Sequence, residues 1–213
     1  MTLNVVSTNT AFGGVQGVYK HASAATGTEM TFSVFVPPHE TGAKLPVVWF
    51  LSGLSCTHAN VTDKGEFRKA CAEFGLIFVA PDTSPRGEGV PDDAEGGYDL
   101  GLGAGFYVDA TEEPFAQNYR MRTYIETELP AIIGENFPAD MDREGIMGHS
   151  MGGHGALTIS LRNPGRYRST SAFAPIVSPM TCPWGHKALG GYLGQDRAVW
   201  AEYDACALIA SGA

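Results

Sequence analysis

The residues best suited to do chemistry in this sequence lie in one short stretch, Gly148-His149-Ser150-Met151-Gly152. It has the form Gly-x-Ser-x-Gly, the pattern of a nucleophile elbow, in which a serine sits on a tight turn between a strand and a helix. The two glycines carry no Cβ, so they allow the strand and the helix to pass closely. The pattern therefore predicts that Ser150 is presented as a nucleophile.

The backbone of Met151 has a predicted role as well. Met151 is the first residue of the expected helix, where backbone N–H groups find no partner within the helix. Such an N–H can donate a hydrogen bond to the negative oxygen that forms when a serine attacks a carbonyl group. We therefore expect the Met151 N–H to be one donor of an oxyanion hole.

The sequence on either side supports an elbow. Residues 143–147 (Arg-Glu-Gly-Ile-Met) are typical of a short buried strand, and residues 156–161 of a helix that ends at Asn163-Pro164-Gly165. Strand, elbow and helix in this order are the setting that the motif requires. The alternative, a glycine-rich loop with an unreactive serine, fits this context less well.

A second oxyanion donor is expected after the strand at residues 47–51 (Val-Val-Trp-Phe-Leu). A continuous apolar run is typical of a strand covered on both faces, and hence of a parallel sheet. The loop that follows, residues 52–57, contains Gly53, and loops at this edge of an α/β sheet present backbone N–H groups to ligands. We assign the donor to the Leu54 N–H. The alternative is an ordinary turn between a strand and a helix.

Other strands alternate with helices along the chain. Residues 15–20 and 29–36 resemble an antiparallel pair, and further strands are expected at residues 76–80 and 169–174. This alternation predicts an α/β fold class with a doubly wound, mostly parallel sheet and helices on both faces. Because no repeat or linker interrupts it, residues 1–213 are expected to form a single domain.

Two helices and a long loop complete the expected architecture. Asp63 with Glu66 three residues later resembles a capping box at the start of one helix. A second helix is expected over residues 121–133, kinked at Pro130. The segment at 83–118 is rich in glycine and proline, and so long a loop in a compact domain is usually functional or mobile.

Composition limits the classes of partner. The 213 residues are 44% hydrophobic and 17% charged, which is typical of a globular protein, and the net charge is −9. A negative chain of this kind is a poor partner for nucleic acid or an anionic membrane surface. No run approaches the roughly 20 apolar residues of a membrane span, and the first residues lack the basic and apolar regions of a secretory signal.

The four cysteines indicate a reduced, cytoplasmic protein without a zinc or other metal site, because none has C-x-x-C spacing. Two of them, Cys56 and Cys71, fall where we expect buried side chains. The four are Cys56, Cys71, Cys182 and Cys206.

The sequence also resembles a known family, over about residues 45 to 204. The matching stretches reach well beyond the elbow, to residues 49–57, 80–87, 103–111, 118–121, 174–185 and 191–194. On these stretches the chain resembles the S-formylglutathione hydrolases, also called esterase D, a family with the α/β-hydrolase fold. The resemblance implies a serine thioesterase that hydrolyses S-formylglutathione to formate and glutathione in formaldehyde detoxification, with side activity on small esters.

The resemblance implies roles for five residues. Ser150 would be the nucleophile, the Leu54 and Met151 N–H groups would form the oxyanion hole, and Trp184 and Cys56 would border the substrate pocket. For the last two, a purely structural role in the core is the alternative. No metal or organic cofactor is implied, and the partner is a small glutathione thioester. A homodimer is suggested by the resemblance alone.

One part of the family's pattern is missing. The catalytic acid and histidine of the family lie after the strand at 169–174, and this sequence stops at Ala213 before either. His149 and His154 flank the elbow, but neither is expected to reach Ser150 while a carboxylate holds it. We therefore expect the chain to be incomplete at its C-terminus and inactive as given, with the strand at 169–174 left as an exposed apolar edge.

Two other functions stay open on the residues alone. One is a general carboxylesterase or acyltransferase of the same fold, which would prefer p-nitrophenyl acetate to S-formylglutathione. The other is a non-catalytic remnant that keeps the elbow without the rest of the triad.

Overall fold

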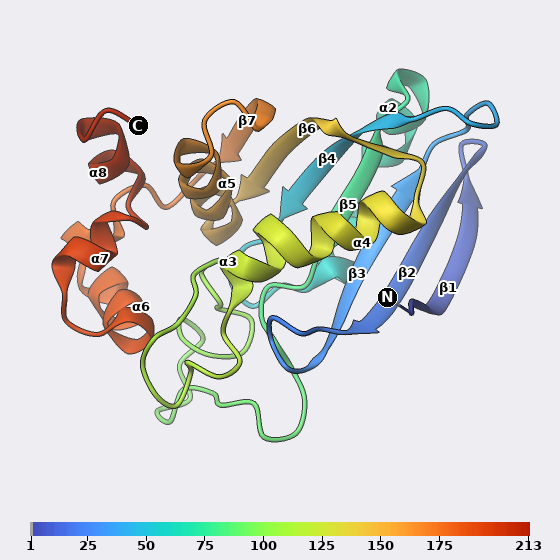
Figure 1. Ribbon diagram of the computed structural model, residues 1–213. Helices are drawn as coiled ribbons and strands as arrows, with labels where there is room; N and C mark the ends of the chain where they lie inside the picture. Colours follow the sequence, from blue (N-terminus) through green and yellow to red (C-terminus); the bar gives the residue numbers. More distant parts are fainter. Residues whose placement is uncertain (1) are drawn as a thin grey trace.

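The computed structural model describes residues 2–213, and a seven-stranded sheet forms its centre, in the order β1-β2-β3-β5-β4-β6-β7 (Figure 1). Strands β4 to β7 pair in parallel, whereas β1–β2, β2–β3 and β3–β5 pair antiparallel. The predicted fold class is confirmed. The sheet is mixed because short connections join β1 to β2 and β2 to β3, and such connections produce antiparallel pairs. The strands are β1 Asn4–Ala11, β2 Gly14–Ala22, β3 Glu29–Val36, β4 Leu45–Leu51, β5 Ile77–Pro81, β6 Ala139–His149 and β7 Tyr167–Phe173.

Helices cover both faces of the sheet. In Figure 1, α4 and α5 cross the near face and α2 lies behind it, while α6, α7 and α8 gather at the end of the chain. No helix formed by residues 2–213 has the length and apolar character needed to cross a bilayer. The helices are α1 His58–Lys64, α2 Phe67–Phe74, α3 Met121–Thr123, the π-helix η1 Tyr124–Glu128, α4 Leu129–Asn136, α5 Met151–Arg162, the 3₁₀ helix η2 Pro179–Thr181, α6 Pro183–Leu193, α7 Arg197–Ala201 and α8 Ala205–Ala210.

The expected capping box at Asp63 and Glu66 is wrong. Asp63 lies inside α1, and Glu66 precedes α2 without a side-chain hydrogen bond to its backbone. The capping box lies instead at the start of α1, where the Asn60 side chain accepts from the Thr57 N–H at 2.9 Å. Thr57 ends the loop after β4, so this cap begins α1 directly beside the loop.

The predicted helix over residues 121–133 forms as α3, η1 and α4 in succession, and its π-helical part, Tyr124–Glu128, ends just before Pro130, which lies in the first turn of α4. Proline has no N–H to offer the Glu126 carbonyl four residues earlier. That carbonyl instead accepts a hydrogen bond of 2.8 Å from Arg166 Nη1. The disturbance expected at the proline thus lies just before it, as the π-helix η1.

The expectation of an exposed apolar edge at residues 169–174 needs correction. β7 pairs with β6 alone among the described strands and is exposed, but its side chains are mostly polar, although Phe173 at its end is 51% exposed. The long segment 83–118 has no helix or strand of its own, yet Phe106 and Tyr107 are almost completely buried within it. It therefore forms part of the core.

The elbow glycines are required by close backbone contacts. A Cβ placed on Gly152 would lie 1.8 Å from the carbonyl oxygen of Leu51, and one on Gly148 would lie 2.1 Å from the carbonyl oxygen of Gly152. Real Cβ atoms essentially never approach other atoms so closely. The end of β4 and the start of α5 are therefore in contact only because these side chains are absent.

We predict that Gly152→Ala destabilises the protein by about 3 kcal/mol or more, or prevents folding, because the backbone of β4 must move. Urea unfolding followed by circular dichroism measures this. The matched control is Gly190→Ala in α6, where the nearest atom to a new Cβ is the flexible Gln195 side chain at 3.3 Å. This control should be neutral or slightly stabilising; equal stability of the two variants would contradict the argument.

Candidate active site

Ser150 lies at the junction of β6 and α5 in a strained backbone conformation, with φ of 57° and ψ of −119°. Its N–H donates to the Phe173 carbonyl at 2.9 Å, and its own carbonyl accepts from the His154 N–H at 3.0 Å. Positive φ in a residue other than glycine has an energetic cost and persists only where the surroundings impose it. Here the strand and the helix hold the serine in the conformation that the motif predicts.

The loop at residues 52–57 passes directly beside the serine. A Cβ placed on Gly53 would lie 3.2 Å from the Cβ of Ser150, which is closer than most Cβ contacts, so the glycine leaves room for the serine. The backbone N–H groups of Leu54 and Met151 have no acceptor among residues 2–213. Both predicted donors are thus unpaired and belong to segments that meet at Ser150.

Trp184 and Cys56 have different neighbours near the elbow. Trp184 of α6 is partly buried, and its ring centroid is 5.8 Å from that of Phe106, which in turn contacts the His154 ring at 6.1 Å. Cys56 lines a hollow of about 270 Å³ together with Gly53 and other residues between the loop and α1. The expectation that Cys56 is buried is wrong because it borders this hollow, whereas Cys71 is only 5% exposed.

Neither histidine of the elbow pairs with the serine. His149 is exposed at the end of β6 and lines the same hollow as Cys56. His154 is fully buried in α5, and both of its ring nitrogens lack a hydrogen-bond partner among the described residues. Burial lowers the pKa of the His154 imidazole to about 4, although the Asp204 carboxylate opposes this shift. The ring is therefore neutral at pH 7.

Within residues 2–213, no histidine makes a hydrogen bond with Ser150 Oγ. Asp204, the carboxylate that influences His154, instead accepts from the backbone N–H groups of Met180 and Ala207. The same residues contain no cluster of three or more side chains suited to hold a metal ion. The described site thus supplies a strained serine and two backbone donors.

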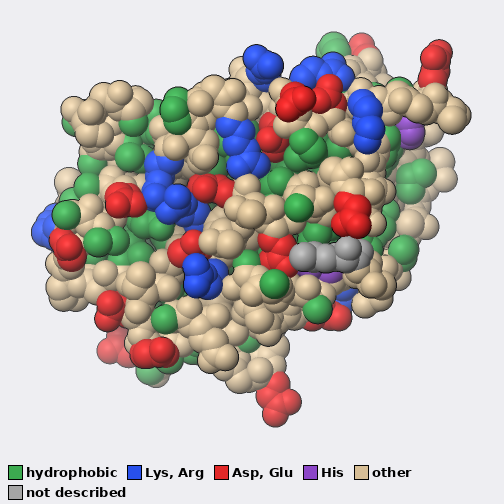
Figure 2. Space-filling view, in the orientation of Figure 1, with side chains coloured by type: hydrophobic (Ala, Val, Ile, Leu, Met, Phe, Trp, Pro, Cys, Tyr) green, Lys and Arg blue, Asp and Glu red, His purple; other side chains and the backbone are tan. Residues whose placement is uncertain are grey.

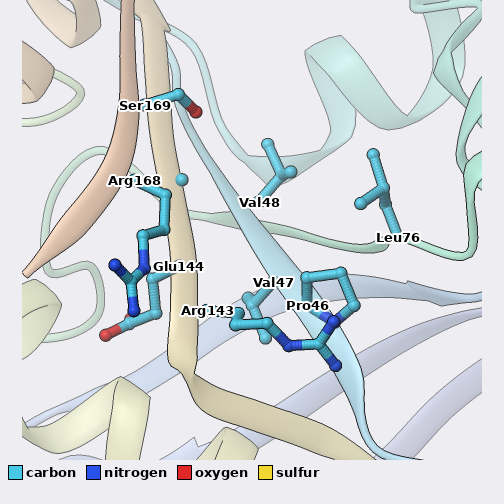
Figure 3. A pocket seen from close by; sticks show the side chains of 9 residues that line it. Pro46, Val47, Val48, Leu76, Arg143, Glu144, Arg168 and Ser169 are labelled. Carbon is cyan, nitrogen blue, oxygen red and sulfur yellow. The ribbon is translucent and has the colours of Figure 1, made fainter.

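A larger hollow lies at the opposite end of the strands. It has a volume of about 500 Å³, and Figure 3 shows Arg168 beside Glu144 on one side, Val48 and Leu76 on the other, and Arg143 beside Pro46. Its β4 residues, Pro46 to Val48, begin the strand, whereas the elbow follows the end of the neighbouring β6. This hollow is therefore remote from Ser150 and takes no part in the candidate site.

Comparison with known proteins points to one group of enzymes. The family model Esterase matches residues 23–213. The S-formylglutathione hydrolase of Paracoccus denitrificans is 54% identical over 211 residues, which cover 98% of this chain and 75% of that protein. The S-formylglutathione hydrolase of Rattus norvegicus is 50% identical, over 99% of this chain and 74% of its own length.

A solved structure agrees with these relatives. The S-formylglutathione hydrolase from Agrobacterium tumefaciens superposes with a TM-score of 0.96 at 58% sequence identity. The match covers 99% of this chain and 76% of that one. The similarity expected over residues 45 to 204 therefore extends over nearly all of this sequence.

We predict that His154 makes stability depend on pH. An unfolded histidine titrates near pH 6.5 and the folded one near 4, so between these values the unfolded chain binds more protons. This contribution to stability is complete above pH 6.5, and about 2 kcal/mol of it should be lost between pH 7 and pH 5. Urea unfolding across this range measures the slope.

The His154→Leu variant should show a shallower slope. Some slope should remain, because burial also lowers the pKa of His21 and of His58. A His154→Leu slope equal to that of the wild type would show that this histidine does not titrate as proposed.

Proposed function

The chain belongs to the S-formylglutathione hydrolase family of esterases, and on this premise we propose that it hydrolyses S-formylglutathione to formate and glutathione. The observation that carries the proposal is the strained Ser150 beside a glycine loop, with two unpaired backbone donors at the same place. Small esters are expected as side substrates. The reaction closes the detoxification of formaldehyde.

The mechanism begins with attack of Ser150 Oγ on the formyl carbon, as a base accepts the hydroxyl proton. The carbonyl oxygen becomes negative and accepts hydrogen bonds from the Leu54 and Met151 N–H groups, each of which lowers the barrier by roughly 3 kcal/mol. The C–S bond then breaks, and glutathione leaves as a thiolate. Water attacks the formyl-serine, which releases formate and restores the hydroxyl group.

The leaving group favours thioesters. A thiol has a pKa near 8.5, so the thiolate departs with less help from a proton donor than an amine needs. None of the described histidines is placed to act as the base, and we therefore assign no residue in this sequence to the triad acid or histidine. No metal or organic cofactor enters these steps.

The wider properties of the protein are part of the proposal. On the face shown in Figure 2, lysine and arginine side chains are interspersed with acidic ones, and the net charge is −9, which supports a small-molecule substrate and no nucleic acid. The four free cysteines support a cytoplasmic location. Residues 1–213 are proposed to belong to one domain, and a homodimer follows from the family resemblance.

We predict that Ser150→Ala lowers kcat by at least about 10⁴-fold, because the nucleophile is lost while the fold keeps its packing. Formate or thiol release from S-formylglutathione by the complete natural protein measures this. The matched control is Ser160→Ala in the same helix, whose hydroxyl donates only to the Leu157 carbonyl. A Ser150→Ala variant that kept a tenth of the wild-type rate would refute the nucleophile assignment.

The two proposed pocket residues can be tested together with substrate choice. Trp184→Ala should raise KM several-fold with a smaller effect on kcat, because the tryptophan offers an apolar wall rather than a reacting group. Cys56→Ala should behave similarly if the cysteine borders the substrate. An unchanged KM for both S-formylglutathione and p-nitrophenyl acetate would remove these residues from the pocket.

A further inference from the structure

The Tyr107 side chain contacts both segments that carry the predicted oxyanion donors, the loop at residues 52–57 and helix α5. It is fully buried, and its hydroxyl donates a hydrogen bond of 2.8 Å to the Ser52 carbonyl, at the start of the loop beside Ser150. Its ring lies against α5, because a Cβ placed on Gly155 would be 2.5 Å from Tyr107 Cδ2. One side chain thus contacts both the segment that carries the Leu54 N–H and the helix that begins with Met151.

Residues 103–107, the segment that ends with Tyr107, also hold the loop at residues 52–57 beyond Leu54. The Ser55 N–H donates to the Gly103 carbonyl at 2.8 Å. A Cβ on Gly103, which has φ of +77°, would lie 2.8 Å from the Cα of Ser55. The residues that precede and follow Leu54 are therefore both held by residues 103–107, whereas the Leu54 N–H between them has no acceptor among the described residues.

Residues 101–107 are themselves held on several sides. The Tyr192 hydroxyl of α6 accepts from the Gly101 N–H and donates to the Ala104 carbonyl, both at 2.8 Å. Ser84 Oγ accepts from the Gly103 N–H at 2.8 Å. Tyr107 adopts a φ of 54°, a conformation that is costly for a residue with a side chain. Such cost and such anchoring are expected of a segment that must hold one position.

We propose that Tyr107 is a positioning residue of the esterase reaction, which sets the direction of the Leu54 N–H through its hydrogen bond to Ser52. This inference rests on the proposed function of the site. An oxyanion donor is effective because it is already oriented before charge develops. Without the hydroxyl, the carbonyl of the buried Ser52 loses this hydrogen-bond donor. Because a buried carbonyl without a donor is costly, the loop is expected to reorient and to carry the Leu54 N–H with it.

The test is Tyr107→Phe in the complete natural protein, with S-formylglutathione as substrate. We expect kcat to fall roughly tenfold or more and KM to stay within about twofold, because an orienting contact acts on the transition state rather than on substrate binding. Affinity for a trifluoromethyl ketone, which forms a tetrahedral adduct with serine, should fall by the same factor as kcat/KM. The melting temperature is recorded alongside.

The matched control is Tyr124→Phe, which also removes a fully buried tyrosine hydroxyl. The hydroxyl of Tyr124 lies 3.2 Å from His21 Nε2, on η1 and away from the elbow. This control should lower stability to a similar extent and leave kcat unchanged. A folded Tyr107→Phe variant whose kcat is within twofold of the wild-type value would overturn the inference.

Two further variants keep the outcomes separate. If Tyr107→Phe does not fold, Tyr192→Phe tests the same anchoring through residues 101–104, and it should lower kcat several-fold. An unchanged kcat in folded Tyr192→Phe would then overturn the inference. Ser150→Ala reports on the proposed function: activity in that variant refutes the site itself, whereas loss of activity there with a normal Tyr107→Phe refutes only the positioning role.

Discussion

The candidate site depends on one steric constraint, the contact between the end of β4 and the start of α5. A Cβ on Gly152 would meet the Leu51 carbonyl at 1.8 Å, so the helix can lie against the strand end only where glycine stands. This contact brings the loop after β4 against Ser150, and it places a strained serine, the first N–H of a helix and the Leu54 N–H at one point. The ester hydrolysis of the family depends on these three groups lying together.

Strands β4 and β6, which lead into the loop at residues 52–57 and into the elbow, are also joined by buried side chains. Glu144 of β6 is only 4% exposed, and its carboxylate accepts from Trp49 Nε1 of β4 at 2.6 Å and from Arg166 Nε at 3.2 Å. A buried carboxylate is tolerable where it is paired and hydrogen-bonded in this way. The pair fixes β4 beside β6, so the loop and the elbow emerge from neighbouring strands in a constant relation.

The long segment after β5 adds the remaining support. It has no regular secondary structure, yet it fills the core with aromatic side chains and contacts both the loop and the elbow helix. A loop of this length usually serves a function or moves. Here its buried tyrosine and its glycines form the support under the oxyanion loop, and the hydroxyl of Tyr192 connects that support to α6.

The sequence alone determined the elements whose signals are local. The elbow glycines and the apolar run of β4 could be read from neighbouring residues, and the family could be recognised from motifs. Strand β1 was not predicted from the sequence. The capping box was placed at Asp63 and Glu66 because their spacing is the same as that of Thr57 and Asn60, where the cap actually forms. Only the tertiary structure decided which distant groups meet. Tyr107 and Ser52 are 55 residues apart, and nothing near either one specifies a hydrogen bond that forms only when the core is packed.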